Sequence, residues 1–216
     1  MNKTDLKLYA ITDRQWLHGA SLSEHVKLAI EGGATMIQIR DKDILSTDSD
    51  AGLKDEYSEA LEIKRICHEH KVPLIINDNV QFAIDIDADG VHLGQDDMNP
   101  AEARKLLGTD KIIGVTAKTV EQAKKAQADG ADYLGSGAVF GSTTKLNAKP
   151  MTKELLSEIT AAVDIPVVAI GGINADNAST LKGTGIAGIA VVGAIFASED
   201  IKAAAKALAE ICDNML

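Results

Sequence analysis

The stretch VPLIINDNVQFAIDIDADGVHLGQDD, residues 72–97, contains two short apolar runs that each end in polar residues. Short apolar runs between turn-forming residues are typical of strands that are buried on both faces of a parallel sheet. We therefore expect strands at 74–77 and 90–93. Further runs of the same kind predict strands at 7–12, 36–40, 112–116, 133–136, 167–170 and 188–192.

The segments between these runs are rich in Ala, Glu and Lys, with apolar residues at three- and four-residue spacing. That spacing places the apolar side chains on one face of a helix. It predicts helices such as 22–31, 56–70, 120–128 and 153–163. Eight alternating strand–helix units in 216 residues are typical of an α/β protein with a single (β/α)8 TIM barrel domain, residues 1–216.

The composition limits the classes of partner. The chain carries 22 Lys and Arg residues against 32 Asp and Glu, a net charge of −10, which excludes general attraction to nucleic acid or to an anionic membrane. Cys67 and Cys212 are far apart and show no metal-ligand spacing. The N-terminus lacks the apolar region of a signal peptide, and the apolar stretch 186–197 is too short to cross a bilayer. We expect a cytoplasmic protein.

The second predicted strand ends in Gln38-Ile-Arg-Asp-Lys42. Because side chains alternate along a strand, Gln38, Arg40 and Lys42 point to one side, and Ile37 and Ile39 point to the other. A solvated face is the alternative, but the two isoleucines would pack well against outer helices. We therefore expect the amide and the two cations to face the interior of the barrel at its catalytic end.

Acidic residues follow the third and fourth predicted strands. Asp78 with Asp96 or Asp97 would provide the one or two carboxylates that Mg²⁺ takes in proteins, with water and phosphate oxygens completing its shell. Helix capping is the alternative, because a helix is expected near Pro100, but Asn99 is itself a good N-cap. His92 lies within the fourth strand, where a lone histidine is more often structural than catalytic.

Glycine-rich loops follow the last three predicted strands. Residues 135–145 combine glycines, hydroxyls and Lys145, which together suit an anion. Gly171-Gly172 follows the seventh strand and Gly193 the eighth, at the positions where phosphate sites of (β/α)8 barrels are often built. The residues thus predict two anion sites, one with magnesium and cations and one with loop backbone.

The polar segment Asp43 to Asp55 follows the second predicted strand. It is either a mobile rim of the catalytic face or an inert insertion.

Several motifs, in order along the chain, resemble those of thiamine-phosphate synthase. They are Tyr9-Ala-Ile-Thr-Asp13, Gln38-Ile-Arg-Asp-Lys42, Ile76-Asn-Asp-Asn79, Ala88-Asp-Gly-Val-His-Leu-Gly-Gln-Asp-Asp97, Ala131-Asp-Tyr-Leu-Gly-Ser-Gly137 and Ile170-Gly-Gly-Ile173. The resemblance implies a transferase that joins hydroxymethylpyrimidine diphosphate to thiazole phosphate carboxylate. The products are thiamine phosphate, diphosphate and carbon dioxide. In that family, magnesium-assisted ionisation gives a pyrimidinylmethyl cation, which the thiazole nitrogen captures.

The resemblance also implies roles for individual residues. Asp78 and Asp97 would hold Mg²⁺. The pyrimidine diphosphate would be bound by Gln38, Arg40, Lys42, Asn77, Thr116 and Lys145, of which Arg40, Lys42, Thr116 and Lys145 would act catalytically. The thiazole phosphate would be bound by Ser142, Thr144, Gly172, Val192 and Gly193.

The chain departs from the family pattern at four places. Thr116 replaces a common serine but keeps a hydroxyl, and Lys118 stands where histidine is common. Gly141-Ser142 replaces a usual Pro-Thr, and Gly193 replaces a usual serine. The last two changes concern the expected site for the thiazole phosphate.

Two other functions fit parts of the pattern. A thiazole tautomerase is a related barrel that isomerises the thiazole phosphate without magnesium, and it would have no use for Asp78, Asp97, Arg40 and Lys42. A non-catalytic sensor of a phosphate ligand is the second alternative, although no appended partner domain favours it. Small-molecule substrates are the expected partners, and the sequence leaves open whether the chain forms a homo-oligomer.

Overall fold

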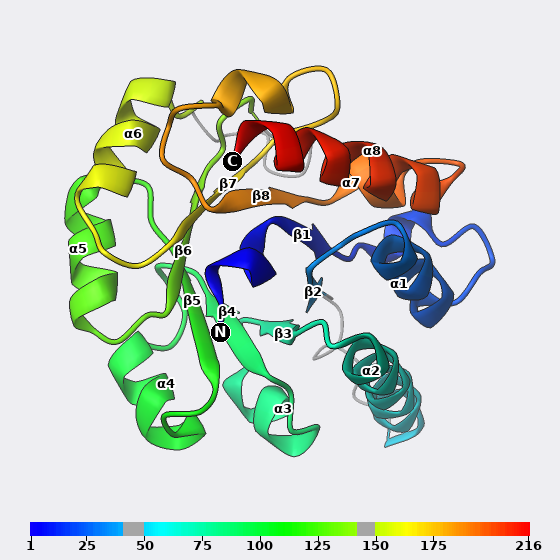
Figure 1. The fold of residues 1–216 in the computed structure, drawn as a ribbon. Coiled ribbons are helices and arrows are strands. Elements are labelled where there is room, and N and C mark those ends of the chain that lie inside the picture. The colour runs from blue at the N-terminus through cyan, green and yellow to red at the C-terminus, as the bar shows by residue number, and fades with distance from the viewer. Residues whose placement is uncertain (41–49, 142–149) are drawn as a thin grey trace.

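The computed structural model describes residues 1–40, 50–141 and 150–216. Its parallel strands pair in sequence order, and β8 pairs with β1, which closes the barrel. The strands are β1 (Leu8–Ile11), β2 (Met36–Ile39), β3 (Leu74–Asn77), β4 (Gly90–Leu93), β5 (Ile112–Thr116), β6 (Tyr133–Gly137), β7 (Val167–Ile170) and β8 (Gly188–Val191). The expectation of a (β/α)8 barrel is confirmed, and Figure 1 shows the strands surrounded by helices.

The α-helices lie outside the strands (Figure 1). They are α1 (Leu22–Glu31), α2 (Asp50–His70), α3 (Val80–Asp85), α4 (Pro100–Leu107), α5 (Val120–Ala128), α6 (Lys153–Ala161), α7 (Gly193–Phe196) and α8 (Ile201–Met215). Three 3-10 helices accompany them: η1 (Lys3–Leu6), η2 (Arg14–Trp16) and η3 (Ala178–Leu181). In the part of the chain that is described, no helix is long and apolar enough to cross a membrane.

The connection from β7 to β8 differs from the expected strand–helix unit. It contains the four-residue 3-10 helix η3, whereas α7 and α8 both follow β8. The segment 174–185 is rich in Asn, Asp, Thr and Gly, which favour turns over a regular helix. Helix α2, in contrast, begins at Asp50, six residues before the predicted start.

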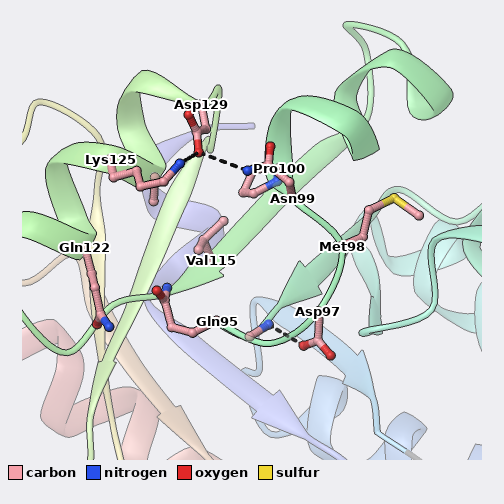
Figure 2. A pocket seen from close by; sticks show the side chains of 11 residues that line it. Gln95, Asp97, Met98, Asn99, Pro100, Val115, Gln122, Lys125 and Asp129 are labelled. Atoms are coloured by element: carbon pink, nitrogen blue, oxygen red, sulfur yellow. Dashed lines mark hydrogen bonds and ion pairs between the residues drawn. The ribbon is translucent and has the colours of Figure 1, made fainter.

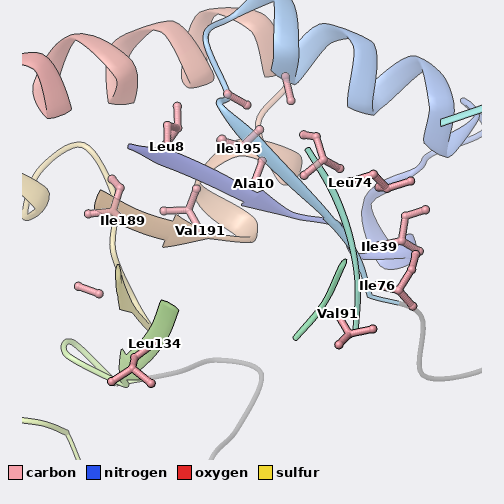
Figure 3. Close-up of a cluster of buried hydrophobic side chains, with 14 of the residues drawn as sticks. Leu8, Ala10, Ile39, Leu74, Ile76, Val91, Leu134, Ile189, Val191 and Ile195 are labelled. Atoms are coloured by element: carbon pink, nitrogen blue, oxygen red, sulfur yellow. The ribbon is translucent and has the colours of Figure 1, made fainter. Parts of the chain in front are cut away.

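Alternation along each strand divides the core into two layers. Leu8, Ala10, Ile37 and Ile39 belong to the large cluster between the strands and the helices, part of which Figure 3 shows. Tyr9, Ile11, Met36, Ile75 and Tyr133 belong to the smaller cluster inside the barrel. Leu6 of η1 joins this inner cluster and closes the N-terminal end of the barrel. The opposite end, where the strands finish, is therefore the open end that can receive a ligand.

Candidate functional site

The polar residues of β2 lie as the alternation predicts. Ile37 and Ile39 pack in the outer layer, whereas Gln38 is 2% exposed and its Nε2 donates to the hydroxyl of Tyr9 inside the barrel. Arg40 follows the strand, and its backbone N–H donates to Thr12 Oγ1 over 3.1 Å. Its guanidinium lies 3.9 Å from an Oδ2 of Asp13. Lys42 lies outside the described residues.

The ends of β3 and β4 bring two carboxylates together. Asn77 Nδ2 donates to Asp78 Oδ2 over 2.6 Å, and Asp78 has a φ of 60°, a left-handed conformation that Asp tolerates better than most residues. The backbone N–H of Gly94 donates to Asp97 Oδ2 over 2.6 Å. This hydrogen bond brings the Asp97 side chain back to the first residue of the loop after β4. The carboxyl group of Asp97 then lies within hydrogen-bonding reach of Asp78.

The electrostatics at Asp78 favour a bound cation. Partial burial and the adjacent Asp97 raise the pKa of Asp78 from 3.8 to about 6, although Asn77 and the charge of Arg40 act in the opposite direction. Two carboxylates at this distance repel each other when both are ionised. A divalent cation between them would remove that repulsion, and the carboxylate oxygens are ligands of the kind that Mg²⁺ takes.

Helix capping does not explain these aspartates. Asn99 is the N-cap of α4, and its Oδ1 accepts from the backbone N–H of Ala101 over 2.8 Å. Of the two neighbouring aspartates, Asp97 is the one that raises the pKa of Asp78. Within residues 1–40, 50–141 and 150–216, no group of three or more His, Cys, Asp or Glu side chains could hold a metal. The pair therefore leaves most of a cation's shell to water and ligand oxygens.

The end of β5 carries Thr116. Its hydroxyl lies 3.0 Å from Nε2 of His92, and its carbonyl accepts a 2.6 Å hydrogen bond from Gln95 Nε2. Thr116 therefore stands at the same end of the barrel as the two aspartates. His92 connects Thr116 to the buried Tyr133, because its other ring nitrogen, Nδ1, lies 3.0 Å from the Tyr133 hydroxyl.

The loops after β6 and β7 are in contact. The backbone N–H of Phe140 donates to the carbonyl of Gly171 over 3.0 Å. Gly172 has a φ of 67°, and a Cβ at this position would lie 2.7 Å from the carbonyl oxygen of Phe140, so a side chain there is excluded. After β8, Val192 precedes α7, which begins at Gly193. Ser142, Thr144 and Lys145 lie outside the described residues.

Comparison with known proteins identifies the family of this chain. A family model described as thiamine monophosphate synthase matches residues 8–195. The chain is 48% identical over 213 residues to the thiamine-phosphate synthase of Ruminiclostridium cellulolyticum, which covers 99% of this chain and 98% of the relative. The chain belongs to the thiamine monophosphate synthase family. Membership makes it a transferase, and thiamine-phosphate synthesis is the activity of the family.

Other relatives agree. The thiamine-phosphate synthase of Clostridium novyi is 48% identical over 206 residues, which cover 95% of this chain and 98% of that protein. A solved structure of thiamine phosphate pyrophosphorylase from Pyrococcus furiosus superposes with a TM-score of 0.87 at 38% identity, covering 99% of this chain and 98% of the other. A KGPDC from Streptococcus mutans, at 13% identity and a TM-score of 0.70, shares the fold alone.

Two tyrosines inside the barrel, Tyr9 and Tyr133, were not predicted from the sequence as part of the site. Their hydroxyls lie 2.9 Å apart inside the barrel, and Tyr133 also lies 3.0 Å from Nδ1 of His92. Both tyrosines fall within the family motifs, but aromatic residues in strands are ordinarily core residues. A signal was present in Gly114, the β5 residue paired with Tyr133, because the absence of a side chain there leaves room for the Tyr133 ring.

A groove lies on the flank of the barrel, beside the loop after β4 (Figure 2). It measures about 260 Å³, and Gln95, Asp97 and Met98 line it on the side of that loop. At its far end Asp129 accepts from Asn99 and forms an ion pair with Lys125. The charges of that end therefore satisfy each other.

Proposed function

We propose that the chain joins hydroxymethylpyrimidine diphosphate to thiazole phosphate carboxylate at the open end of the barrel. The bond between the pyrimidine methylene carbon and the diphosphate oxygen breaks first. The thiazole nitrogen then bonds to that carbon. The thiazole carboxylate is lost as carbon dioxide, and the ring carbon that carried it takes up a proton from solvent. The products are thiamine phosphate, diphosphate and carbon dioxide.

The observation that carries this proposal is the pairing of Asp78 with Asp97 at adjacent strand ends. Burial first and Asp97 second raise the pKa of Asp78, so a negative charge on Asp78 is unfavourable there without a cation. Mg²⁺ fits the pair because it binds oxygen ligands and commonly takes only one or two carboxylates alongside phosphate. When bound, Mg²⁺ would stabilise negative charge on the leaving diphosphate.

The other polar residues would bind and orient the pyrimidine diphosphate. Arg40 is close enough to Asp78 for its charge to lower that pKa, so its guanidinium lies beside the expected diphosphate. Asn77 holds Asp78 in place, and Gln38 presents its amide from the barrel interior. Lys42 and Lys145 would add positive charge to the same anion, and the Thr116 hydroxyl would donate to it.

The second substrate would be anchored by the loops after β6, β7 and β8. Gly172 keeps its backbone clear of side-chain atoms. Val192 with Gly193 opens the first turn of α7, in which Ile195 and Phe196 donate to the Val192 carbonyl, so the N–H groups of Gly193 and Ala194 are the ones offered to a ligand. These backbone groups suit the thiazole phosphate, with Ser142 and Thr144 as hydroxyl contacts. Gly193 provides no hydroxyl of its own, so backbone donors would carry more of the phosphate binding.

This reaction depends on charge stabilisation more than on proton transfer. Ionisation of a diphosphate needs cations and hydrogen-bond donors placed before the reaction occurs. Arg40, Thr116 and the metal pair supply such groups without a nucleophile or a general base. The substrates are then small molecules, and the buried thiols of Cys67 and Cys212 agree with a reducing cytoplasm.

A synthesis assay tests the proposal. The purified protein is mixed with both substrates and MgCl₂, and thiamine phosphate and diphosphate are measured in equal amounts over time. We expect product with Mg²⁺ and none in EDTA. The absence of product at saturating substrate, together with isomerisation of the thiazole phosphate alone, would replace this assignment with a tautomerase.

A further inference from the structure

Five polar side chains form a continuous line of hydrogen-bonding contacts inside the barrel. Gln38 Nε2 lies 2.5 Å from Tyr9 Oη, and Tyr9 Oη lies 2.9 Å from Tyr133 Oη. Tyr133 Oη lies 3.0 Å from His92 Nδ1, and His92 Nε2 lies 3.0 Å from Thr116 Oγ1. The line crosses the interior from β1 and β2 to β4, β5 and β6.

The backbone around this line is shaped to accommodate it. A Cβ at Gly114 would lie 2.1 Å from Cζ of Tyr133, and a Cβ at Gly135 would lie 3.0 Å from Cε1 of His92. Both glycines therefore leave room for the rings that carry the line. Tyr9 and Tyr133 are almost completely buried, and burial raises the pKa of both phenols, so each keeps its proton.

Those protons give the line a direction. A buried hydroxyl proton is costly without an acceptor. Because the Gln38 amide donates to Tyr9, the acceptor for the Tyr9 proton among its described contacts is the Tyr133 oxygen. The Tyr133 proton then goes to His92 Nδ1, which must be unprotonated to accept it.

Other protonation states of His92 leave a proton without an acceptor. With a proton on Nδ1, in either the neutral or the cationic ring, His92 donates to Tyr133. Tyr133 must then donate to Tyr9, which already accepts from Gln38. The Tyr9 proton is left without an acceptor among the described contacts of that hydroxyl.

We propose that these five side chains act as one directional hydrogen-bond chain, in which Gln38 fixes His92 as the neutral tautomer with its proton on Nε2. His92 Nε2 then donates to Thr116 Oγ1, which leaves the threonine proton free to be donated toward the open end of the barrel. Tyr9, Tyr133 and His92 are positioning residues in this scheme. That Thr116 donates to the leaving diphosphate rests on the proposed function, whereas the tautomer of His92 does not.

Nuclear magnetic resonance on the substrate-free protein tests the chain directly. A long-range ¹H–¹⁵N correlation spectrum reports which imidazole nitrogen carries the proton, and the His92 signals are assigned by their loss in His92→Asn. We expect a protonated Nε2 and a bare Nδ1 that accepts a hydrogen bond. A protonated Nδ1 in the unaltered protein would overturn the proposal.

Gln38→Glu tests the direction over three hydrogen bonds. An ionised carboxylate only accepts, so the chain should reverse and place a proton on His92 Nδ1. A neutral carboxylic acid donates as the amide does and should leave Nδ1 bare. The carboxyl carbon resonance of the introduced side chain reports which state is present. A bare Nδ1 beside an ionised carboxylate in Gln38→Glu would refute the coupling. Gln81→Glu, at an exposed position of α3, is the matched control and is expected to leave Nδ1 unprotonated.

Tyr133→Phe provides a test that keeps the ring over Gly114. Loss of the hydroxyl should move the His92 Nδ1 resonance toward that of a nitrogen without a hydrogen bond. Tyr57→Phe is the matched control, because the Tyr57 hydroxyl donates to Asp85 at the surface over 2.7 Å. An Nδ1 resonance that is equal in Tyr133→Phe and the unaltered protein would contradict the proposed contact. Since no substrate is present, these results are independent of the synthesis assay.

Discussion

Replacing Asp78 with Asn should stabilise the fold in the absence of divalent cations while abolishing the metal-dependent reaction. The pKa of Asp78 is raised from 3.8 to about 6 by partial burial and by Asp97. Each tenfold change in a protonation equilibrium corresponds to about 1.4 kcal/mol, so a fully buried group with this shift would cost the fold about 3 kcal/mol when ionised. Because the burial of Asp78 is only partial and much of its surface still faces solvent, screening reduces the expected gain to about 1 kcal/mol. Asn also tolerates the left-handed backbone at this position.

The sign of the pH dependence follows from the raised pKa. Below about pH 4 the Asp78 carboxyl is protonated in both the folded and unfolded chains, so the two variants should be equally stable. As the pH rises through about 6, the unaltered protein ionises this group and loses stability relative to Asp78→Asn. At neutral pH in EDTA, the variant should therefore melt about 2–4 °C higher.

Thermal unfolding in EDTA and in MgCl₂ measures both effects. MgCl₂ should raise the melting temperature of the unaltered protein, because it binds the folded state, and should affect Asp78→Asn much less. Asp96→Asn is the matched control, since Asp96 is an exposed carboxylate next to Asp97. If Asp78→Asn melted below the unaltered protein in EDTA at neutral pH, or gained as much from MgCl₂, the account of this pair would be refuted.

Three further substitutions test other parts of the site. Thr116→Ser keeps the hydroxyl and should retain most activity. Thr116→Val should lower kcat by about 10- to 100-fold, the factor that corresponds to loss of a hydrogen bond to a charged group. Equal kinetics for the two variants would contradict a donor role for Thr116. Arg40→Met should lower kcat/KM by a similar factor in steady-state kinetics. It should also raise the pKa of Asp78 further, which a titration of the carboxyl carbon resonance in EDTA measures. A fall in that pKa would contradict the nearness of Arg40 to Asp78. Gly114→Ala should destabilise the fold by about 1–3 kcal/mol in urea unfolding, because its Cβ would overlap Tyr133, and unchanged stability would show that the ring has room to move.

Local patterns predicted most of the strands. Leu74–Asn77, Gly90–Leu93, Ile112–Thr116 and Val167–Ile170 have the expected bounds, because an apolar run and its flanking turn residues are both short-range features. The connection before β8 was not predicted, since the choice between a 3-10 and an α-helix depends on how the short segment fits over the barrel. The capping residue of α4, Asn99, could be predicted because a side-chain cap and Pro at the first turn are local signals.

The site was predicted to a smaller extent. Alternation along β2 placed Gln38 inside the barrel, and the strand ends placed Asp78 and Asp97 at one mouth. The sequence left open whether Asp96 or Asp97 pairs with Asp78 until the family resemblance was considered. That choice depends on the fold of one loop, in which Gly94 holds Asp97 by its backbone N–H.

The sequence by itself determined the barrel, the faces of its strands and the residue types at its open end, because period-two alternation and turn chemistry act between near neighbours. The tertiary structure decided which polar groups touch. Tyr9 and Tyr133 are 124 positions apart and meet only because closure brings β1 and β6 to face each other across the interior. The raised pKa of Asp78 has the same origin, since burial and the nearness of Asp97 exist only once the strand ends converge.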